Sequence, residues 1–317
     1  MILEARVAAE RELRSAHVHE CVSMSTVEAP VLRTLRSRFG LVAALALVAL
    51  PVGLLQVRSA AAADGQPCTA PQAVSHLDAP LAGFARTVQR SREIRVVAIG
   101  SSSTEGTGAS SRQKAFPARL DQELDRRFPG KDFQVANLGK GGELADAMVA
   151  RLKKDVIPTK PALVIWQTGV NDAIHGVDIA AFQATLEGGL AALKAADIEV
   201  VMIDQQFYPR AATVPHYEDY IAIVHKVAKA HHVPVFRRYA IMRYLISSGQ
   251  HSVDALLWRD KFHLNDMSYG CLADLMASAV ADRIRERDIA PGLVAHSSPT
   301  HGSPPVTPAG DSQSINF

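Results

Sequence analysis

The sequence predicts an α/β protein built as a three-layer αβα sandwich around a doubly wound, parallel sheet of five strands. Short apolar runs alternate with longer amphipathic segments between residues 94 and 287, and this alternation is typical of parallel strands joined by right-handed helical crossovers. Several apolar runs end at glycine or small polar residues, as strands do where an α/β sheet presents its ligand-binding edge. The region shows neither an internal repeat nor a second domain.

The first predicted strand covers residues 94–99, a nearly continuous apolar run. Gly100 ends it, and three serines follow directly: Ser101, Ser102 and Ser103. A run of this length and composition is typical of a buried strand. The serines then form either a plain polar turn or a set of side chains presented at the open end of the sheet, and the rest of the chain favours the second interpretation.

Four more strands are predicted from similar apolar runs, at residues 133–138, 163–168, 200–204 and 233–236. Apolar residues that recur every three or four positions predict helices at residues 116–128, 144–156, 179–196, 217–232, 241–247 and 267–287. In the first of these helices, Phe116, Leu120, Leu124 and Phe128 form one apolar stripe, and a proline-glycine pair follows. Such a pair is a helix stop signal.

The N-terminal region has the features of a secretory signal peptide. Residues 41–57 are mostly apolar, arginines precede them, and a run of alanines ending at Ala63 follows. A basic flank, an apolar middle and a small-residue exit are the three parts of such a signal, so we expect cleavage after Ala63 and export to the periplasm or the medium. The alternative is an uncleaved anchor in the inner membrane, although the run is shorter than the ~20 residues of a typical span. Met24 gives a more usual signal length than Met1.

Composition divides the chain into four parts. Residues 1–63 form the extension with its signal, and residues 64–92, which carry few strong signals, are expected to wrap the domain as an N-terminal arm. The predicted domain covers residues 93–290. Residues 291–317 are rich in proline and serine without periodicity, so a disordered tail is expected.

Charge argues against a nucleic-acid partner. The chain has 34 basic and 32 acidic residues, and the seven arginines and five glutamates within residues 1–63 account for the small excess. The rest is neutral, whereas nucleic-acid binding needs a basic face.

Two of the three cysteines, Cys68 and Cys271, follow the predicted cleavage site. In an oxidising compartment they can form a disulfide, and two buried free thiols are an equally open alternative. Neither cysteine lies beside a sequence pattern typical of metal ligands, so we expect no metal and no cofactor.

Polar residues follow three predicted strands and precede the last helix. Ser102 follows the first strand, Gly142 the second and Asn171 the third, while Asp260 and His263 lie in the loop before the last helix. These positions converge on one crevice in a doubly wound sheet. Their residue types suit acyl transfer, in which a histidine takes the proton of a serine, a carboxylate orients the histidine, and a glycine N–H and an asparagine amide donate to the oxyanion.

Four short blocks in order make the chain resemble the SGNH hydrolases, also called the GDSL esterase/lipase superfamily. GSSSTEG at residues 100–106 resembles that family's G-D-S-L-T-E-G block, and NLGKGGE at residues 137–143 resembles its second block. GVND at residues 169–172 matches G-x-N-D, and DKFH at residues 260–263 matches D-x-x-H. The resemblance covers about residues 94–287 and implies a flavodoxin-like sheet and a serine esterase.

The resemblance assigns a role to each candidate residue. The nucleophile falls on Ser102, whose backbone N–H joins Gly142 and Asn171 in the oxyanion hole. The acid and base of the triad fall on Asp260 and His263.

The first block departs from the family's motif at two positions. Ser101 stands where the motif has Asp, and Ser103 stands where it has Leu. Neither position carries the chemistry, so the departures concern subfamily and substrate. The G-x-S-x-G elbow of α/β-hydrolases is absent from the chain, which argues against that fold.

Other conspicuous residues are interpreted as structural. Asp172 and His175 also form a D-x-x-H, which we treat as a coincidence because it directly follows the third strand and has no loop of its own. Trp166 is expected in the core. Four histidines on or beside the 217–232 helix are expected on a solvated surface: His216, His225, His231 and His232.

Three hypotheses about function remain. The first is an exported serine esterase that hydrolyses O-acetyl groups on saccharides, or lipid and lysophospholipid esters. The second is an O-acyltransferase that uses the same residues, and the third is a non-catalytic polysaccharide-binding module on the same fold. The expected partner is a small-molecule, saccharide or lipid ester, with membrane contact only through an uncleaved signal anchor.

Overall fold

A computed structural model describes residues 68–294. Its five strands are all parallel and lie in the order β2-β1-β3-β4-β5. They are β1 (Glu93–Gly100), β2 (Asp132–Gly139), β3 (Leu163–Gln167), β4 (Glu199–Ile203) and β5 (Val235–Phe236). This is the flavodoxin-like strand order. The chain adds β2 on one side of β1 and then β3, β4 and β5 on the other side, so the switch point lies between β1 and β3. The predicted doubly wound parallel sheet is therefore confirmed.

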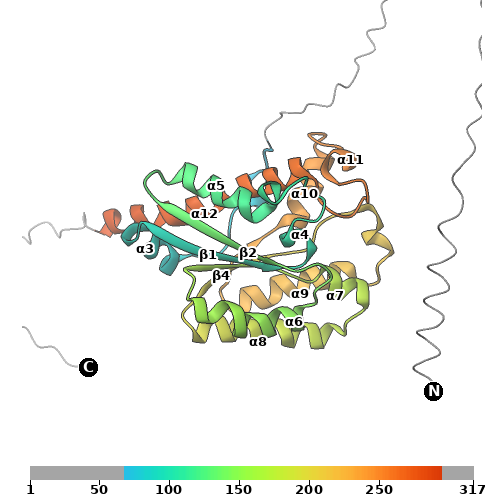
Figure 1. The fold of residues 1–317 in the computed structure, drawn as a ribbon, viewed down its shortest axis with the longest axis horizontal. Helices are drawn as coiled ribbons and strands as arrows, with labels where there is room; N and C mark the ends of the chain where they lie inside the picture. The colour runs from blue at the N-terminus through green and yellow to red at the C-terminus, as the bar shows by residue number, and fades with distance from the viewer. Residues whose placement is uncertain (1–67, 295–317) are drawn as a thin grey trace, which may run out of the picture. The chain divides into compact units, whose positions relative to one another are not determined.

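Helices cover both faces of the sheet and form the outer layers (Figure 1). On one face lie α3 (Ala82–Arg90), α5 (Phe116–Arg127) and α12 (Asp266–Val294). On the other lie α6 (Ala145–Arg151), α8 (Ile179–Ala195) and α9 (Tyr217–Ala230). Shorter helices are α2 (Gln72–Ser75), α4 (Ser102–Glu105), α7 (Val170–His175), α10 (Arg238–Ser247) and α11 (Val253–Leu256). Single turns of other helix types are η1 (Arg112–Lys114), η2 (Leu152–Val156), η3 (Ile157–Thr159) and η4 (Pro209–Thr213).

The central strand β3 shows why the sheet needs helices on both faces. All five of its residues are buried, as expected for a strand that is covered on both sides. Trp166 is fully buried, which agrees with its predicted place in the core. Gly189 of α8 lies against this ring, because a Cβ at that position would come within 2.5 Å of the Trp166 side chain. The glycine therefore allows α8 to approach the sheet closely.

Two predicted helices differ in their ends. The predicted 144–156 helix is α-helical in α6, continues as the π-turn η2, and finishes in the 3₁₀ turn η3. Pro158 lies in η3, where its missing N–H and fixed φ disfavour further α-helix. At the C-terminal end, α12 continues to Val294, past the predicted domain boundary at residue 290. The rest of the predicted tail lies outside the described residues.

The predicted N-terminal arm contributes to the core. Phe84, Ala85 and Val88 of α3 are buried against the sheet layer. The first N–H groups of α3 donate to the Glu199 carboxylate at the start of β4, which satisfies donors that a helix N-terminus otherwise leaves free. The arm carries a helix with a buried face, which its sequence did not reveal because the helix is short.

A disulfide joins Cys68 to Cys271 in α12, and it resolves the alternatives that the sequence left open. The bridge spans 203 residues, and closing so long a loop restricts the unfolded chain, an effect typically worth ~2–5 kcal/mol. None of the helices within residues 68–294 combines the length and apolar character that crossing a bilayer requires. The predicted signal segment lies outside this range.

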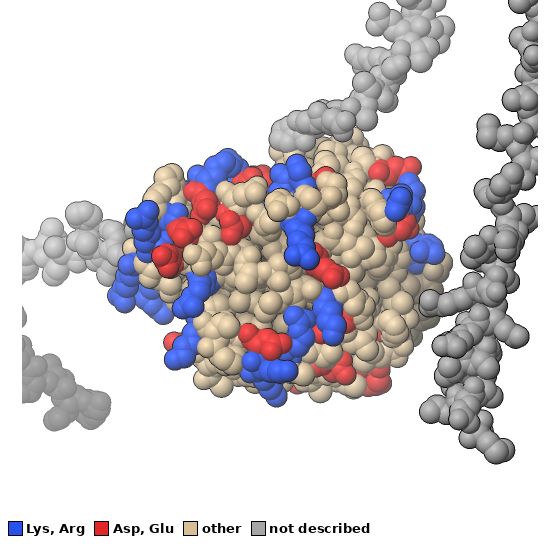
Figure 2. All heavy atoms as spheres, in the orientation of Figure 1, with Lys and Arg blue, Asp and Glu red and all other residues tan. Residues whose placement is uncertain are grey.

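Acidic and basic side chains are interspersed over the face of the molecule that Figure 2 shows.

Candidate active site

Ser102 lies where β1 turns sharply into the short helix α4. Gly100 makes this turn possible, because a Cβ there would come within 2.3 Å of Thr104 Oγ1. Gly106 ends the helix with φ of +107°, a conformation that glycine adopts readily. Ser102 is the first residue of α4 and is partly exposed. The turn therefore presents this side chain at the carboxyl edge of the sheet.

His263 connects Ser102 to Asp260. Its Nε2 lies 2.9 Å from Ser102 Oγ, and its Nδ1 lies 2.6 Å from Asp260 Oδ2. The loop before α12 thus brings together three residues that the sequence assigned to one site. Each ring nitrogen faces the partner that a Ser-His-Asp triad requires.

The loop around Asp260 is held by its own hydrogen bonds. Asp260 Oδ1 accepts from the backbone N–H groups of Phe262 and His263, both at 2.9 Å, and Lys261 adopts φ of +56°. Partial burial opposes ionisation of Asp260, but the hydrogen bonds from the His263 ring and these N–H groups outweigh it and lower the pKa of the carboxyl. The carboxylate is thereby fixed as an acceptor for the imidazole N–H.

Gly142 and Asn171 lie in neighbouring segments that hydrogen bonds join. Asn171 Nδ2 donates to the carbonyl of Glu143 at 2.9 Å, so one amide hydrogen holds the residue after Gly142 and the other stays available. Gly142 has φ of +74°, a backbone conformation that favours glycine. A Cβ built there would meet nothing within 4 Å, so the backbone conformation, and not a lack of space, favours glycine at this position. Glu143 is buried and pairs with Arg151 of α6, which secures the segment from behind.

Gly141 links this segment to Ser102. Its backbone N–H donates to Glu105 Oε2 at 3.0 Å, and a Cβ at Gly141 would lie 4.0 Å from Ser102 Cβ. The Glu105 carboxylate at the end of α4 thus holds the Gly141–Gly142 turn beside Ser102. Sequence reasoning did not single out Glu105, although it stands in the first block of the resemblance.

The second D-x-x-H sequence is not arranged as a triad. Asp172 Oδ1 accepts from the N–H of Ala145 at 3.0 Å and so holds the start of α6. Burial raises the pKa of the Asp172 carboxyl. His175 instead lies on α7, with Nδ1 2.8 Å from the carbonyl oxygen of Asn171.

Gln167, at the end of β3, was missed by sequence reasoning and organises the serine turn. Its Oε1 accepts from the N–H of Ser101 at 3.1 Å, from Ser101 Oγ at 3.3 Å and from Thr104 Oγ1 at 3.1 Å. Ser101 and Ser103 are both buried, and Ser103 Oγ lies 3.5 Å from Gln206 Oε1. Both departures from the family motif therefore point into the protein. A polar residue closing an otherwise apolar strand was the available signal for Gln167.

The expectation that His225 is a solvated surface residue is wrong. Its Nε2 lies 2.9 Å from Oδ2 of Asp204, whose side chain is only 2% exposed, and about two thirds of the His225 side chain is buried. A buried carboxylate needs a hydrogen-bonding partner, and the histidine of α9 supplies it. Asp204 follows β4 directly, and that position could have signalled the pair.

Metal-binding residue types cluster at one place within residues 68–294. His251 Nε2 lies 3.7 Å from Cys68 Sγ, and the ligand atoms of Cys68, His251 and Cys271 lie within 4.8 Å of one another. The sequence did not indicate that His251 joins the two cysteines. Both sulfur atoms are in the disulfide, so they offer no thiolate to a metal.

Solved structures with the same fold include several esterases. A two-domain esterase active on acetylated mannans aligns with a TM-score of 0.55 at 19% identity, over 74% of this chain and 60% of that one. An acetyl xylan esterase aligns with a TM-score of 0.51 at 22% identity, over 59% of this chain and 100% of that one. TesA aligns with a TM-score of 0.51 at 20% identity, over 60% and 99%. The chain thus spans about 60% of the two-domain esterase.

At such identities these structures show a shared fold. No curated protein sequence gives a significant match. Residues 67–286, which include every block of the site, match the Non-GDSL lipase-like family. The predicted relationship to SGNH hydrolases is thus confirmed, and the chain belongs to the Non-GDSL lipase-like family.

Proposed function

We propose that the chain is an exported serine carboxylic ester hydrolase. The observation that carries the proposal is the hydrogen-bonded series from Asp260 through His263 to Ser102, with distances of 2.6 and 2.9 Å. A serine hydroxyl is a weak nucleophile until a base takes its proton. The histidine here is held by a carboxylate on one nitrogen and faces the hydroxyl with the other, which is the arrangement that general-base catalysis needs.

The reaction has two halves. His263 Nε2 takes the Ser102 proton while Oγ attacks the ester carbonyl, and the oxyanion accepts hydrogen bonds from the N–H groups of Ser102 and Gly142 and from the Asn171 amide. His263 then gives the proton to the departing alcohol, which leaves an acyl group on Ser102. A water molecule, deprotonated by His263, attacks this acyl-enzyme, and collapse releases the carboxylic acid and restores Ser102.

O-acetyl groups on saccharides are the substrate class that we favour. Two structures that share the fold are described as acting on acetylated mannans and acetyl xylan, and export would bring the enzyme to envelope or extracellular polysaccharides. Lipid and lysophospholipid esters are the alternative within the same chemistry. Transfer of the acyl group to a sugar would use the same residues but would have to exclude water from the acyl-enzyme.

A screen of aryl esters from acetyl to palmitoyl, on protein that begins at Asp64, tests the proposal. We expect hydrolysis with a preference for short acyl chains, and a loss of ~10³-fold or more in Ser102→Ala. Ser101→Ala is the matched control and should keep most of the activity. Product analysis with an added sugar acceptor separates hydrolysis from transfer. If purified, folded protein hydrolyses no ester and transfers no acyl group, the proposal fails and a non-catalytic binding module becomes the better account.

A further inference from the structure

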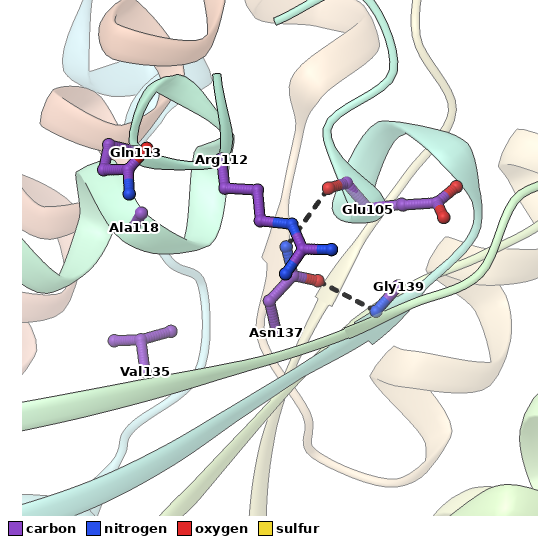
Figure 3. Close-up of a pocket in the computed structure, with 7 residues that line it drawn as sticks. All are labelled: Glu105, Arg112, Gln113, Ala118, Val135, Asn137 and Gly139. Atoms are coloured by element: carbon purple, nitrogen blue, oxygen red, sulfur yellow. Dashed lines mark hydrogen bonds between the residues drawn. The ribbon is translucent and has the colours of Figure 1, made fainter.

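A hollow beside the edge strand β2 lies close to the candidate nucleophile. It measures about 470 Å³, and we call it the β2 hollow. Its lining comes from α4, η1, α5 and β2: Glu105, Arg112, Gln113, Ala118, Val135, Asn137 and Gly139 (Figure 3). Two of these residues belong to segments that also contain candidate site residues. Glu105 is the last residue of α4, the helix that begins at Ser102. Gly139 is the last residue of β2, directly before the turn that contains Gly141 and Gly142.

Arg112 provides a positive charge at this hollow. Its guanidinium extends toward the Asn137 side chain, whereas the Glu105 carboxylate points away from it (Figure 3). That carboxylate accepts instead from the N–H of Gly141. Within residues 68–294, Arg112 forms none of the ion pairs that the structure contains. A guanidinium of this kind can donate two parallel hydrogen bonds to a carboxylate.

The rest of the lining suits a sugar better than an acyl chain. Asn137 is fixed in place, because its Nδ2 donates to the carbonyl of Glu105 at 3.3 Å and its Oδ1 accepts from the N–H of Gly139 at 2.9 Å. Gln113 is exposed at the rim and can hydrogen-bond hydroxyl groups. Ala118 and Val135 are the apolar side chains of the lining, whereas pockets for apolar ligands are lined mostly by apolar and aromatic groups.

The hollow is within reach of the alcohol part of an ester bound at Ser102. Gly141 is flanked on one side by Glu105, whose carboxylate lies 3.0 Å from a Cβ built on this glycine, and on the other by Ser102. Ser102 and Glu105 are the first and last residues of the one-turn helix α4, so about one helical turn, ~5 Å, separates their backbones, and Glu105 lines the hollow. An oligosaccharide that carries an acetyl group can place a neighbouring unit there.

We infer that the β2 hollow binds a sugar unit bearing a carboxylate, a uronic acid, on the alcohol side of an acetylated saccharide. The inference rests on the proposed function, since it names the substrate class of the same site. Arg112 pairs with the carboxylate of the sugar. The side-chain amides of Gln113 and Asn137 donate hydrogen bonds to the sugar hydroxyls or accept hydrogen bonds from them. The pair is exposed to water, so it should confer a preference of a few fold that salt weakens.

The test compares three substrates: an acetylated oligogalacturonide, an acetylated xylo-oligosaccharide and 4-nitrophenyl acetate. Wild-type protein should show a higher kcat/KM for the oligogalacturonide than for the neutral oligosaccharide. Arg112→Gln should lower that ratio by about two- to fivefold through KM, the loss expected for an exposed ion pair, and 0.5 M NaCl should lower it in wild type. Lys114→Gln is the matched control, because it removes a charge from the same turn η1 but does not line the hollow.

The outcomes separate this inference from the proposed function. If wild type hydrolyses 4-nitrophenyl acetate but shows no preference for the oligogalacturonide, the inference is overturned and the proposed function stands. An equal loss in Lys114→Gln would mean general charge attraction and would also overturn it. Failure of wild type on 4-nitrophenyl acetate and both saccharides would remove both the proposed function and the inference.

Discussion

Two of the histidine–carboxylate pairs within residues 68–294, His263 with Asp260 and His225 with Asp204, differ in what the second ring nitrogen faces. His263 bonds Asp260 through Nδ1 and lies 2.9 Å from Ser102 Oγ through Nε2. His225 bonds Asp204 through Nε2, and within residues 68–294 it has no serine hydroxyl among its hydrogen-bond partners. In the proposed mechanism the pair alone is therefore insufficient for catalysis, and Ser102 on the other nitrogen makes the difference.

The two carboxylates also differ in their surroundings. The exposed fraction of the side chain is 32% for Asp260 and 2% for Asp204. Asp204 fastens the end of β4 to α10, since its Oδ1 accepts from the N–H of Tyr239 and its backbone carbonyl accepts from Arg238. The Asp204 pair thus holds two elements together, whereas the Asp260 pair orients the His263 ring toward Ser102.

Removing each imidazole should give the largest contrast. We expect His263→Ala to lose ~10³-fold or more of kcat while it folds normally. His225→Ala should keep its activity but unfold more easily by ~1–3 kcal/mol, because a buried carboxylate oxygen loses its partner. Ester hydrolysis and denaturant unfolding of both variants check this. A stable, active His263→Ala protein would mean that the two roles are reversed.

A smaller loss is expected when Asn171, the proposed oxyanion donor, is replaced. Asn171→Ala should lower kcat by ~10²–10³-fold with little change in KM, since its amide would act mainly on charge that develops in the transition state. Steady-state kinetics on a short-chain aryl ester measure the two constants. A change confined to KM would indicate instead that Asn171 binds the substrate's ground state.

The lowered pKa of Asp260 predicts a simple pH dependence. Between roughly pH 5 and 8 the activity should show no ionisation of this carboxyl, because the carboxylate is already ionised there. Since its folded pKa is depressed, Asp260 stabilises the fold above the ~3.9 of a free aspartic acid and loses this contribution as the pH falls through the folded value. The stability difference between wild type and Asp260→Asn should therefore vanish in acid. A loss of activity caused by protonation of Asp260 within that range would contradict this account.

The sheet and its longer helices could be predicted because their patterns are local and repeated. β1 to β4 begin and end within one residue of the predicted runs, and α5, α8 and α9 start at the predicted positions. The short helices α4 and α7 were missed because four to six residues cannot display a helical repeat. Position after a strand, together with residue type, was enough to select Ser102, Asp260 and His263, which hydrogen bonds join in the structure, and Asn171, which bonds the residue after Gly142.

Contacts that depend on long-range packing could not be predicted. Gln167 bonds Ser101 and Thr104 across two strands, and no feature within either segment specifies that partner. The position of Asp204 directly after β4 marked the carboxylate but not its partner His225, and the sequence allowed the disulfide between Cys68 and Cys271 without requiring it. The β2 hollow is also assembled from four separate elements, so it emerges only when the fold is complete.

Covalent labelling of Ser102 tests most directly whether this crevice is a serine-esterase site. The protein is treated with a fluorophosphonate, and the modified residue is identified by mass spectrometry of its peptides. We predict one modified site, on Ser102, with labelling lost in Ser102→Ala and strongly slowed in His263→Ala but not in His225→Ala. Modification of Ser101 or Ser103 in place of Ser102, or no modification of folded wild-type protein, would contradict the assignment.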